Sequence, residues 1–290
     1  MSHLLLVHAH PDDEVIGTGA TMAKYAAEGH LVTLVTCTRG EEGEVLGEEH
    51  AHRAVEVEDT LGDHRELELK AALDALGVKS HRWLGGAGKY RDSGMMGTPA
   101  NDKPGTFWGA AVEDTTRDMV AILRELRPDV VVTYDEFGGY GHPDHIRAHQ
   151  STVAGIESAA DETYAPELGQ PHRVAKLYYT VIPKSWLQAG IDAMKAAGHV
   201  NFFEVDSADD LPFGVPDEYV TTIISAADYI ENKFGAMRAH ATQIATEGGF
   251  FALSDGVGKE VMGTEAYMLA QGASGPLDDN GQETELFAGL

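Results

Sequence analysis

Cysteine and basic side chains are scarce in this sequence, and both scarcities exclude classes of protein. The single cysteine, Cys37, cannot form a disulfide within the 290-residue chain, so we expect a packed core thiol and a reducing compartment. Only 21 lysine and arginine residues stand against 47 acidic residues, which gives a formal net charge of -26. Such a charge repels polyanions, so neither nucleic acid nor a membrane surface is an expected partner.

Long hydrophobic runs are also missing. No stretch approaches the roughly 20 apolar residues that a membrane span needs. The first apolar run begins at Leu4 and stops at His10, with no basic residues before it, so it does not read as a signal peptide. We therefore expect a cytoplasmic protein, and 43% hydrophobic residues are enough for a large core.

Short β-rich runs alternate with segments of helical period over the first 160 residues. This alternation predicts an α/β fold, with a Rossmann-like, mainly parallel sheet flanked by helices. The continuous valines of "DVVVTYD" indicate a strand buried on both faces. Strands are expected at 4–9, 31–38, near 81 and at 129–135, and helices at 17–28, at 69–76 before Gly77, and at 112–126 before Pro128.

The alternation weakens after residue 160. One strand is expected at 176–183, and the spacing of apolar residues from Ile223 to Ile244 predicts a long amphipathic helix. We expect residues 1–160 to form a Rossmann-like catalytic core that binds a metal. Residues 161–290 are expected to form a smaller C-terminal α/β lobe that completes this core and covers the pocket.

Two predicted strands are each followed by a His-Pro-Asp segment, "HAHPDDE" after the first and "DEFGGYGHPDHIRAH" after the fourth. Ligands of open α/β sheets bind beyond the carboxyl ends of the strands. His142 and His145 lie three residues apart where a helix should begin, so both can face one point. A divalent metal held by His10, Asp13 and His145 would offset the carboxylate repulsion and leave positions open for water and substrate.

The other polar residues of the two segments suit a metal-assisted hydrolase of an acyl or related bond. Asp12 would stand beside the metal and take a proton from its water. His142 is the expected second proton carrier or electrostatic stabiliser, and the Tyr140 hydroxyl could contact a developing oxyanion. Asp144 could orient one imidazole through its other nitrogen.

At these motifs the chain resembles a known family. "AHPDDE" and "GHPDH" are similar to the paired motifs of the N-acetylglucosaminyl-phosphatidylinositol de-N-acetylase superfamily, metal-dependent enzymes that remove acetyl groups from N-acetylglucosamine conjugates. The similarity continues through "VTCTRGEEGEV", "LGGAGKYRDSGM", "AHATQ" and "ETELFAGL", and it is strongest with the branch that serves mycothiol biosynthesis. It implies N-acetylglucosaminyl-inositol as the small-molecule substrate.

The resemblance also implies roles for residues at matching positions. It implies the same three metal ligands, Asp12 as general base, and assistance from His142 and Tyr140. It further implies that Arg65 and Asp92 hold sugar and inositol hydroxyls, with Glu44 a further candidate for that pocket. Zn²⁺ is the expected ion, one per chain, although two histidines and a carboxylate also suit Fe²⁺.

Three alternative functions have distinct signatures. The related mycothiol S-conjugate amidases carry "GGYPHPDH", whereas Gly141 precedes the histidine here, which favours the deacetylase. A nucleotide-binding oxidoreductase would use Gly17 and Gly19, but the third glycine of its fingerprint is missing, so these residues favour close packing of helix on sheet. A non-catalytic metal-binding module would lack open coordination positions. For His240, in the predicted long helix, we expect packing or hydrogen bonding rather than chemistry.

Overall fold

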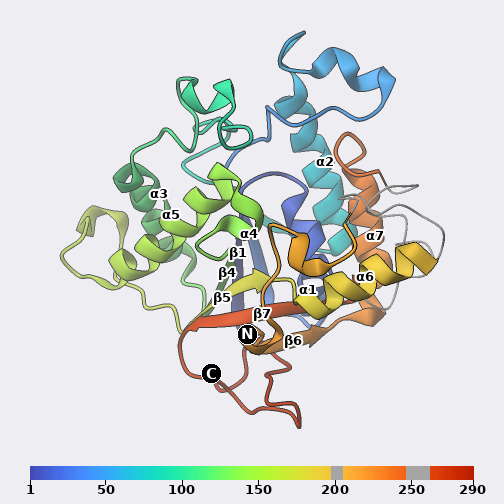
Figure 1. Cartoon of the computed structure of the whole chain (residues 1–290). Helices are drawn as coiled ribbons and strands as arrows, with labels where there is room; N and C mark the ends of the chain where they lie inside the picture. The colour runs from blue at the N-terminus through green and yellow to red at the C-terminus, as the bar shows by residue number, and fades with distance from the viewer. Residues whose placement is uncertain (197–204, 246–261) are drawn as a thin grey trace.

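The computed structural model describes residues 1–196, 205–245 and 262–290. Its strands are β1 (His3–His8), β2 (Leu31–Thr36), β3 (Ser80–Trp83), β4 (Val130–Thr133), β5 (Lys176–Val181), β6 (Thr222–Ser225) and β7 (Thr264–Gln271). They form one seven-stranded sheet in the order β3-β2-β1-β4-β5-β7-β6 (Figure 1). The first five strands pair in parallel, and β7 and β6 add an antiparallel edge. The predicted α/β class is therefore confirmed.

Helices cover both faces of this sheet (Figure 1). One face carries α1, α2 and α7, which pack on one another, and the other carries the pair α3 and α5. The α-helices are α1 (Asp13–Ala27), α2 (Leu61–Leu76), α3 (Val112–Leu126), α4 (Gly138–Gly141), α5 (Pro143–Ala160), α6 (Lys184–Ala196) and α7 (Ile230–Ala239). Short 3-10 helices lie at Glu48–Arg53, Pro99–Asp102, Pro166–Leu168, Ala208–Asp210, Asp217–Tyr219 and Ala227–Tyr229. Within the described ranges, no helix combines the length and the apolar character that crossing a membrane requires.

The central strand β1 explains the apolar run at the start of the chain. All six of its residues are buried. Leu4 and Leu6 belong to the core that α1, α2 and α7 cover, whereas Leu5 and Val7 belong to the core under α3 and α5. Because successive side chains of a strand point to opposite faces, a strand covered on both faces needs apolar residues at every position.

Three local predictions, two about glycines and one about the cysteine, hold. The predicted cap Gly77 ends α2 in the left-handed region, with φ 73°. A Cβ added at Gly17 would lie 2.8 Å from Oγ1 of Thr180 on β5, so α1 lies directly against the sheet there. Cys37 is free and buried, as expected.

The predicted long helix from Ile223 to Ile244 is wrong at both ends. Residues Thr222–Ser225 form β6, which pairs antiparallel with β7, and α7 begins only at Ile230 and ends at Ala239. The start of this segment is rich in β-branched residues, which also fit a short strand. Pairing with β7, which follows some 40 residues later in the chain, selects the strand.

Residues after 160 supply three strands of the same sheet, since β5 pairs with β4 and carries β7 and β6 beyond it. Near the C-terminus, Glu283 is fully buried and its Oε1 lies 2.7 Å from Nζ of Lys176 on β5. α6 packs in a small separate apolar cluster with the segment that follows it, through Ile191, Ala208 and Leu211. The C-terminal part thus extends the sheet as well as adding irregular segments.

Candidate active site and metal centre

The two His-Pro-Asp segments meet at the point where the strand order reverses. From β1 the chain continues to β2 and β3 on one side, and β4 then returns to pair with the other side of β1. Both segments follow the carboxyl ends of these neighbouring parallel strands, and they lead into α1 and α5. Crevices at such switch points are the usual ligand sites of open α/β sheets. As a result, His10 and Asp144, 134 residues apart in the chain, lie in contact.

Three buried imidazoles form the centre of the site. The ring centroid of His10 lies 4.6 Å from that of His142 and 5.3 Å from that of His145, and the last two are 5.1 Å apart. Each ring offers a nitrogen within 4.8 Å of the others. All three side chains are nearly inaccessible to solvent, so a cation between them would be held by protein atoms.

Asp13 joins two of these rings. Its Oδ2 lies 3.2 Å from Nδ1 of His10 and 3.3 Å from Nε2 of His145. Nδ1 of His145 lies 3.2 Å from the carbonyl oxygen of Gly138, which fixes the proton on Nδ1 and leaves a lone pair on Nε2. That Nε2 is buried and has no hydrogen-bond partner among the described residues. Two imidazole nitrogens and a carboxylate oxygen, one of them unpartnered, fit a divalent metal.

The far side of His10 is held by carboxylates. Its Nε2 lies 3.2 Å from Oδ2 of Asp144 and 3.5 Å from Oδ1 of Asp92. Asp144 is fully buried and also accepts hydrogen bonds from the backbone N–H and the hydroxyl of Ser93, at 2.9 and 2.5 Å. By distance, His10, Asp92 and Asp144 could themselves hold an ion. The hydrogen bonds that Asp144 already accepts from Ser93 favour instead a contact that orients His10.

Asp12 has an unusual backbone and a fixed side chain. Its φ is 109°, in the region that residues other than glycine rarely adopt. Nη2 of Arg65 lies 3.2 Å from its Oδ1, and the same guanidinium donates to the carbonyl oxygens of Pro11 and Gly40. Burial raises the pKa of Asp12 to about 6, although the Arg65 charge acts in the opposite direction.

His142 and Tyr140 lie on the outer side of the cluster. Nδ1 of His142 accepts the backbone N–H of Asp144 at 3.1 Å, so its proton is on Nε2. Burial, together with the neighbouring imidazoles, lowers the pKa of His142 to about 3 and keeps it neutral. Tyr140, on α4, is 43% exposed, and its ring centroid is 4.9 Å from that of His145.

The residues expected to bind the sugar lie at different depths. Arg65 and Asp92 are 2% and 3% exposed, and both contact residues of the cluster, Asp12 and His10 respectively. Glu44 is exposed, and its carbonyl oxygen accepts a hydrogen bond from the Gln243 amide. The structure therefore brings Arg65 and Asp92 into the cluster but leaves Glu44 near the surface.

Sequence reasoning missed Tyr134, the residue directly after β4. Its hydroxyl donates to Oδ2 of Asp13 at 2.8 Å and accepts the backbone N–H of Ala9 at 2.9 Å. Its ring stacks on that of His145, with centroids 4.1 Å apart. One buried side chain thus supports two of the expected metal ligands. Its only signal in the sequence was a tyrosine at the carboxyl end of an otherwise apolar strand.

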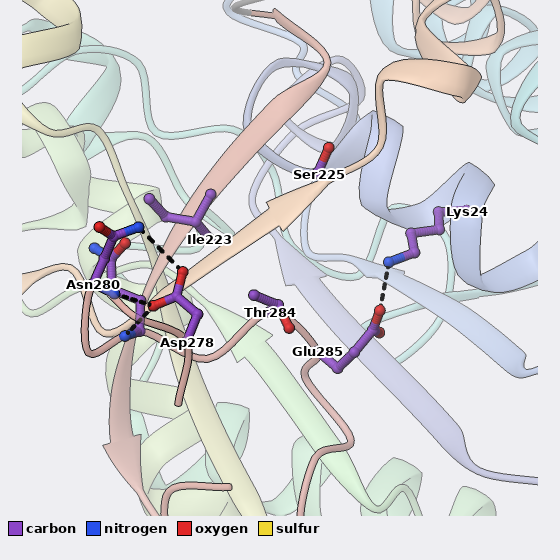
Figure 2. A pocket seen from close by; sticks show the side chains of 8 residues that line it. Lys24, Ile223, Ser225, Asp278, Asn280, Thr284 and Glu285 are labelled. Carbon is purple, nitrogen blue, oxygen red and sulfur yellow. Dashed lines mark hydrogen bonds and ion pairs between the residues drawn. The ribbon is translucent and has the colours of Figure 1, made fainter. Parts of the chain in front are cut away.

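Figure 2 shows a separate hollow of about 310 Å³, whose lining includes no residue of this cluster. It is lined by Lys24, Ile223, Asp278 and Glu285, among others. Lys24 lies eleven residues along α1 from Asp13, which corresponds to about 16 Å of helix. Lys24 pairs with Glu285 at 2.7 Å, and Asp278 accepts two backbone N–H groups of its own turn. The charged groups of this hollow are already paired, so the chemistry points to the histidine cluster.

Known proteins share both the sequence and the fold. A family model described as PIG-L, GlcNAc-PI de-N-acetylase, matches residues 5–156. The 1D-myo-inositol 2-acetamido-2-deoxy-alpha-D-glucopyranoside deacetylase of Geodermatophilus obscurus is 56% identical over 288 residues, covering 99% of this chain and 97% of the relative. A protein of Catenulispora acidiphila named as deacetylase 1 for the same compound is 57% identical, covering 99% of this chain and 89% of the relative.

Among solved structures, the N,N'-diacetylchitobiose deacetylase of Pyrococcus horikoshii has a TM-score of 0.62 at 19% identity, covering 92% of this chain and 83% of the other. At this identity the likeness shows the fold alone, whereas the family model includes both His-Pro-Asp segments of the site. Together with the identities along nearly the whole chain, that match places the protein: it belongs to the PIG-L family of GlcNAc-PI de-N-acetylases.

Proposed function

We infer that this chain is a deacetylase that hydrolyses the acetamide of 1D-myo-inositol 2-acetamido-2-deoxy-alpha-D-glucopyranoside. The products are acetate and the free amine, and the reaction belongs to mycothiol biosynthesis. The observation that carries the inference is identity above one half, along 99% of the chain, with relatives named for this activity. The buried cluster of histidines and aspartates at the switch point supplies the chemistry that such a hydrolysis needs.

We propose that Nδ1 of His10, Oδ2 of Asp13 and Nε2 of His145 would hold one zinc ion per chain, with Fe²⁺ as the competing ion. A divalent ion held there would supply Lewis-acid polarisation of the acetamide carbonyl and of a water molecule. The unpartnered Nε2 of His145 and the carboxylate contact to both imidazoles support this ligand set.

Asp12 would act as the general base. Arg65 holds Oδ1 of this carboxylate, which leaves Oδ2 for the proton of the attacking water. A pKa near 6 suits a group that must accept a proton and return it near neutral pH. The Tyr140 hydroxyl would donate to the developing oxyanion. Asp12 and His142 are the two candidates for protonating the departing amine, and the lowered pKa of His142 favours Asp12, which takes up the proton of the water. Asp144 would keep His10 oriented for the metal.

Arg65, Asp92 and Glu44 are the proposed contacts to the sugar and inositol hydroxyls. Nε of Arg65 is buried without a hydrogen-bond partner among the described residues, so it could donate to a hydroxyl that enters the site. The Asp92 carboxylate is held by the backbone N–H groups of Glu42 and Gly94, at 3.2 and 2.8 Å. Glu44 would act at the rim, where its exposed side chain lies.

The decisive experiment is an assay of acetate release from N-acetylglucosaminyl-inositol. We expect turnover by the metal-loaded protein, its loss after chelation, and its return when Zn²⁺ or, under anaerobic conditions, Fe²⁺ is added. A bimane S-conjugate of mycothiol, assayed in parallel for mercapturate release, should be the poorer substrate. Faster cleavage of that conjugate would identify an S-conjugate amidase, and stoichiometric metal without hydrolysis of either compound would contradict an enzymatic role.

A further inference from the structure

The backbone of Asp12 needs support from its neighbours. With φ 109° and ψ -32°, it lies where a residue with a side chain remains only if surrounding groups hold it. The strain occurs one residue before α1 and directly beside the expected metal ligand Asp13. If Asp12 relaxed to negative φ, its carboxylate would point in another direction.

Glu14 provides the nearest support. Its Oε2 accepts the backbone N–H of Asp12 at 2.8 Å, which is the bond that a change of φ at Asp12 would break. Its Oε1 lies 2.7 Å from Nε2 of His240. Both Glu14 and His240 are fully buried, so neither oxygen of this carboxylate depends on water for a partner.

His240 reaches this position from the C-terminal part of the chain. It directly follows α7, whose Phe234 and Met237 pack in the core beside α1. Because Glu14 is a buried carboxylate, a proton on Nε2 of His240 compensates the burial of its charge. Nδ1 of His240 is buried without a hydrogen-bond partner among the described residues. Among the described residues, the hydrogen bond of the His240 ring is therefore the one to Glu14.

We propose that Glu14 and His240 are positioning residues that hold Asp12 at positive φ and thereby direct its carboxylate into the site. Neither residue touches the reacting atoms in this scheme. The catalytic consequence rests on the proposed function, in which Asp12 is the base. The conformational consequence does not, because it concerns only the backbone of Asp12.

Lys233 provides a matched control for His240. Lys233, on α7, is buried, and its Nζ lies 2.7 Å from Oε1 of Glu265. Glu265 accepts the backbone N–H groups of Ala20 and Thr21 on α1, at 3.0 and 2.8 Å. Replacing either Lys233 or His240 with Ala thus removes the side chain that pairs with a buried carboxylate, Glu265 or Glu14 respectively. Of the two replacements, only that of His240 affects Glu14, the carboxylate that accepts the backbone N–H of Asp12.

The test compares His240→Ala, His240→Gln and Lys233→Ala in the metal-loaded full chain. We expect His240→Ala to lower kcat for acetate release by about 100-fold, with KM within about twofold and metal content unchanged. His240→Gln, whose amide nitrogen can donate to Glu14 as Nε2 does, should restore most of kcat. Lys233→Ala should lower the melting temperature while leaving kcat unchanged.

A crystal structure of His240→Ala reads the conformation directly. We expect Asp12 to move to negative φ. If His240→Ala does not fold, Glu14→Gln serves in its place, because its neutral amide oxygen should accept the backbone N–H of Asp12 more weakly and so allow the same change of φ. Positive φ retained in the variant, or equal kcat in His240→Ala and Lys233→Ala, would overturn the proposal. Wild-type protein that releases no acetate would refute the proposed function instead, and the Asp12 backbone would still decide the positioning role.

Discussion

Two buried charged clusters lie in different parts of the same sheet, and they differ in how completely their polar atoms are bonded. We call Lys176, Tyr178, Thr222 and Glu283 the edge cluster, and His10, Asp13, Asp92, His142, Asp144 and His145 the histidine cluster. In the edge cluster, Lys176 donates to Glu283 and to the Tyr178 hydroxyl. The Glu283 carboxylate also accepts from Tyr178, Thr222 and the Gly275 N–H.

The histidine cluster is not saturated in this way. Nε2 of His145, in the cluster, and Nε of Arg65, beside it, are buried without hydrogen-bond partners in the part of the chain that the structure describes. Three carboxylates stand among three imidazoles, and among the described residues no lysine forms an ion pair with them. Saturated buried polar groups stabilise a fold, whereas unsatisfied ones need a ligand or a reaction to explain them. The edge cluster thus has the bonding of a structural cluster, whereas the unpartnered atoms of the histidine cluster support the proposed metal and substrate site.

Replacing Asp12 tests the functional cluster most severely. Asp12→Ala removes the proposed base while leaving the three metal ligands in place. We expect kcat for acetate release to fall by about 10²- to 10⁴-fold, with metal content equal to that of the wild type. Steady-state kinetics and elemental analysis on the same preparation measure both quantities, and near-normal turnover would sink the assignment of Asp12.

Replacing Lys176 tests the structural cluster. Lys176→Ala leaves Glu283 buried and unpaired, so we expect the free energy of unfolding to fall by about 3–5 kcal/mol. The kcat of the protein that remains folded should not change, because Lys176 begins β5 beside the first residue of β4, whereas the histidines lie beyond the carboxyl ends of β1 and β4. Chemical denaturation followed by circular dichroism gives the stability. A loss of kcat larger than the loss of folded protein would contradict the division between the clusters.

A pair of tyrosine replacements compares the clusters directly. Tyr134 and Tyr178 are both buried, and each donates its hydroxyl to a carboxylate, Asp13 and Glu283 respectively. We expect Tyr134→Phe to weaken metal binding about 10- to 100-fold, because the carboxylate ligand loses its hydrogen bond. Tyr178→Phe should leave metal affinity unchanged and lower only stability. Competition with a chromophoric chelator measures both affinities, and equal affinities in the two variants would exclude a role for Tyr134 at the metal.

The smallest expected effect is a pH dependence of stability at the edge cluster. Burial alone would raise the pKa of Glu283, but hydrogen bonds from Lys176 and the Gly275 N–H outweigh it and lower the pKa below the ordinary 4.5. A carboxyl group with a depressed pKa in the folded state stabilises fully above its unfolded pKa and loses that contribution as the pH falls through the folded value.

The difference in unfolding free energy between wild type and Glu283→Gln should therefore be constant from pH 7 to about 5 and shrink below about 4.5. Urea denaturation at a series of pH values measures it. A difference that stays constant down to pH 3 would show that Glu283 keeps its ordinary pKa. The Glu58→Gln variant, which replaces an exposed glutamate elsewhere in the chain, controls for general acid effects.

Much of the fold could be predicted because its signals are local. The apolar runs of β1 and β4, the cap at Gly77 and the helix end before Pro128 each depend on neighbours within a few residues. The segment from Ile223 to Ile244 could not be divided correctly, since its spacing suits helix and strand alike. Only the pairing of β6 with β7 decides between them.

The candidate site could be predicted in outline for a similar reason. Two His-Pro-Asp segments after parallel strands indicate a shared edge of the sheet, and the structure brings His10 and His145 together there. The supports of the site gave no such pattern. Tyr134 follows an ordinary strand, and His240 lies 226 residues from its partner Glu14, so no spacing in the chain relates them.

By itself, the amino-acid sequence determined the α/β class, the metal-binding type of side chain and the place of the two motifs after their strands, because periodicity and local turns encode these. Tertiary structure alone decided which buried charges are saturated. It completed the edge cluster with Glu283 from the C-terminal segment, and it left Nε2 of His145 without a hydrogen-bond partner among the described residues. The physical reason is that hydrogen bonds between distant segments form only when the sheet and its helices have packed.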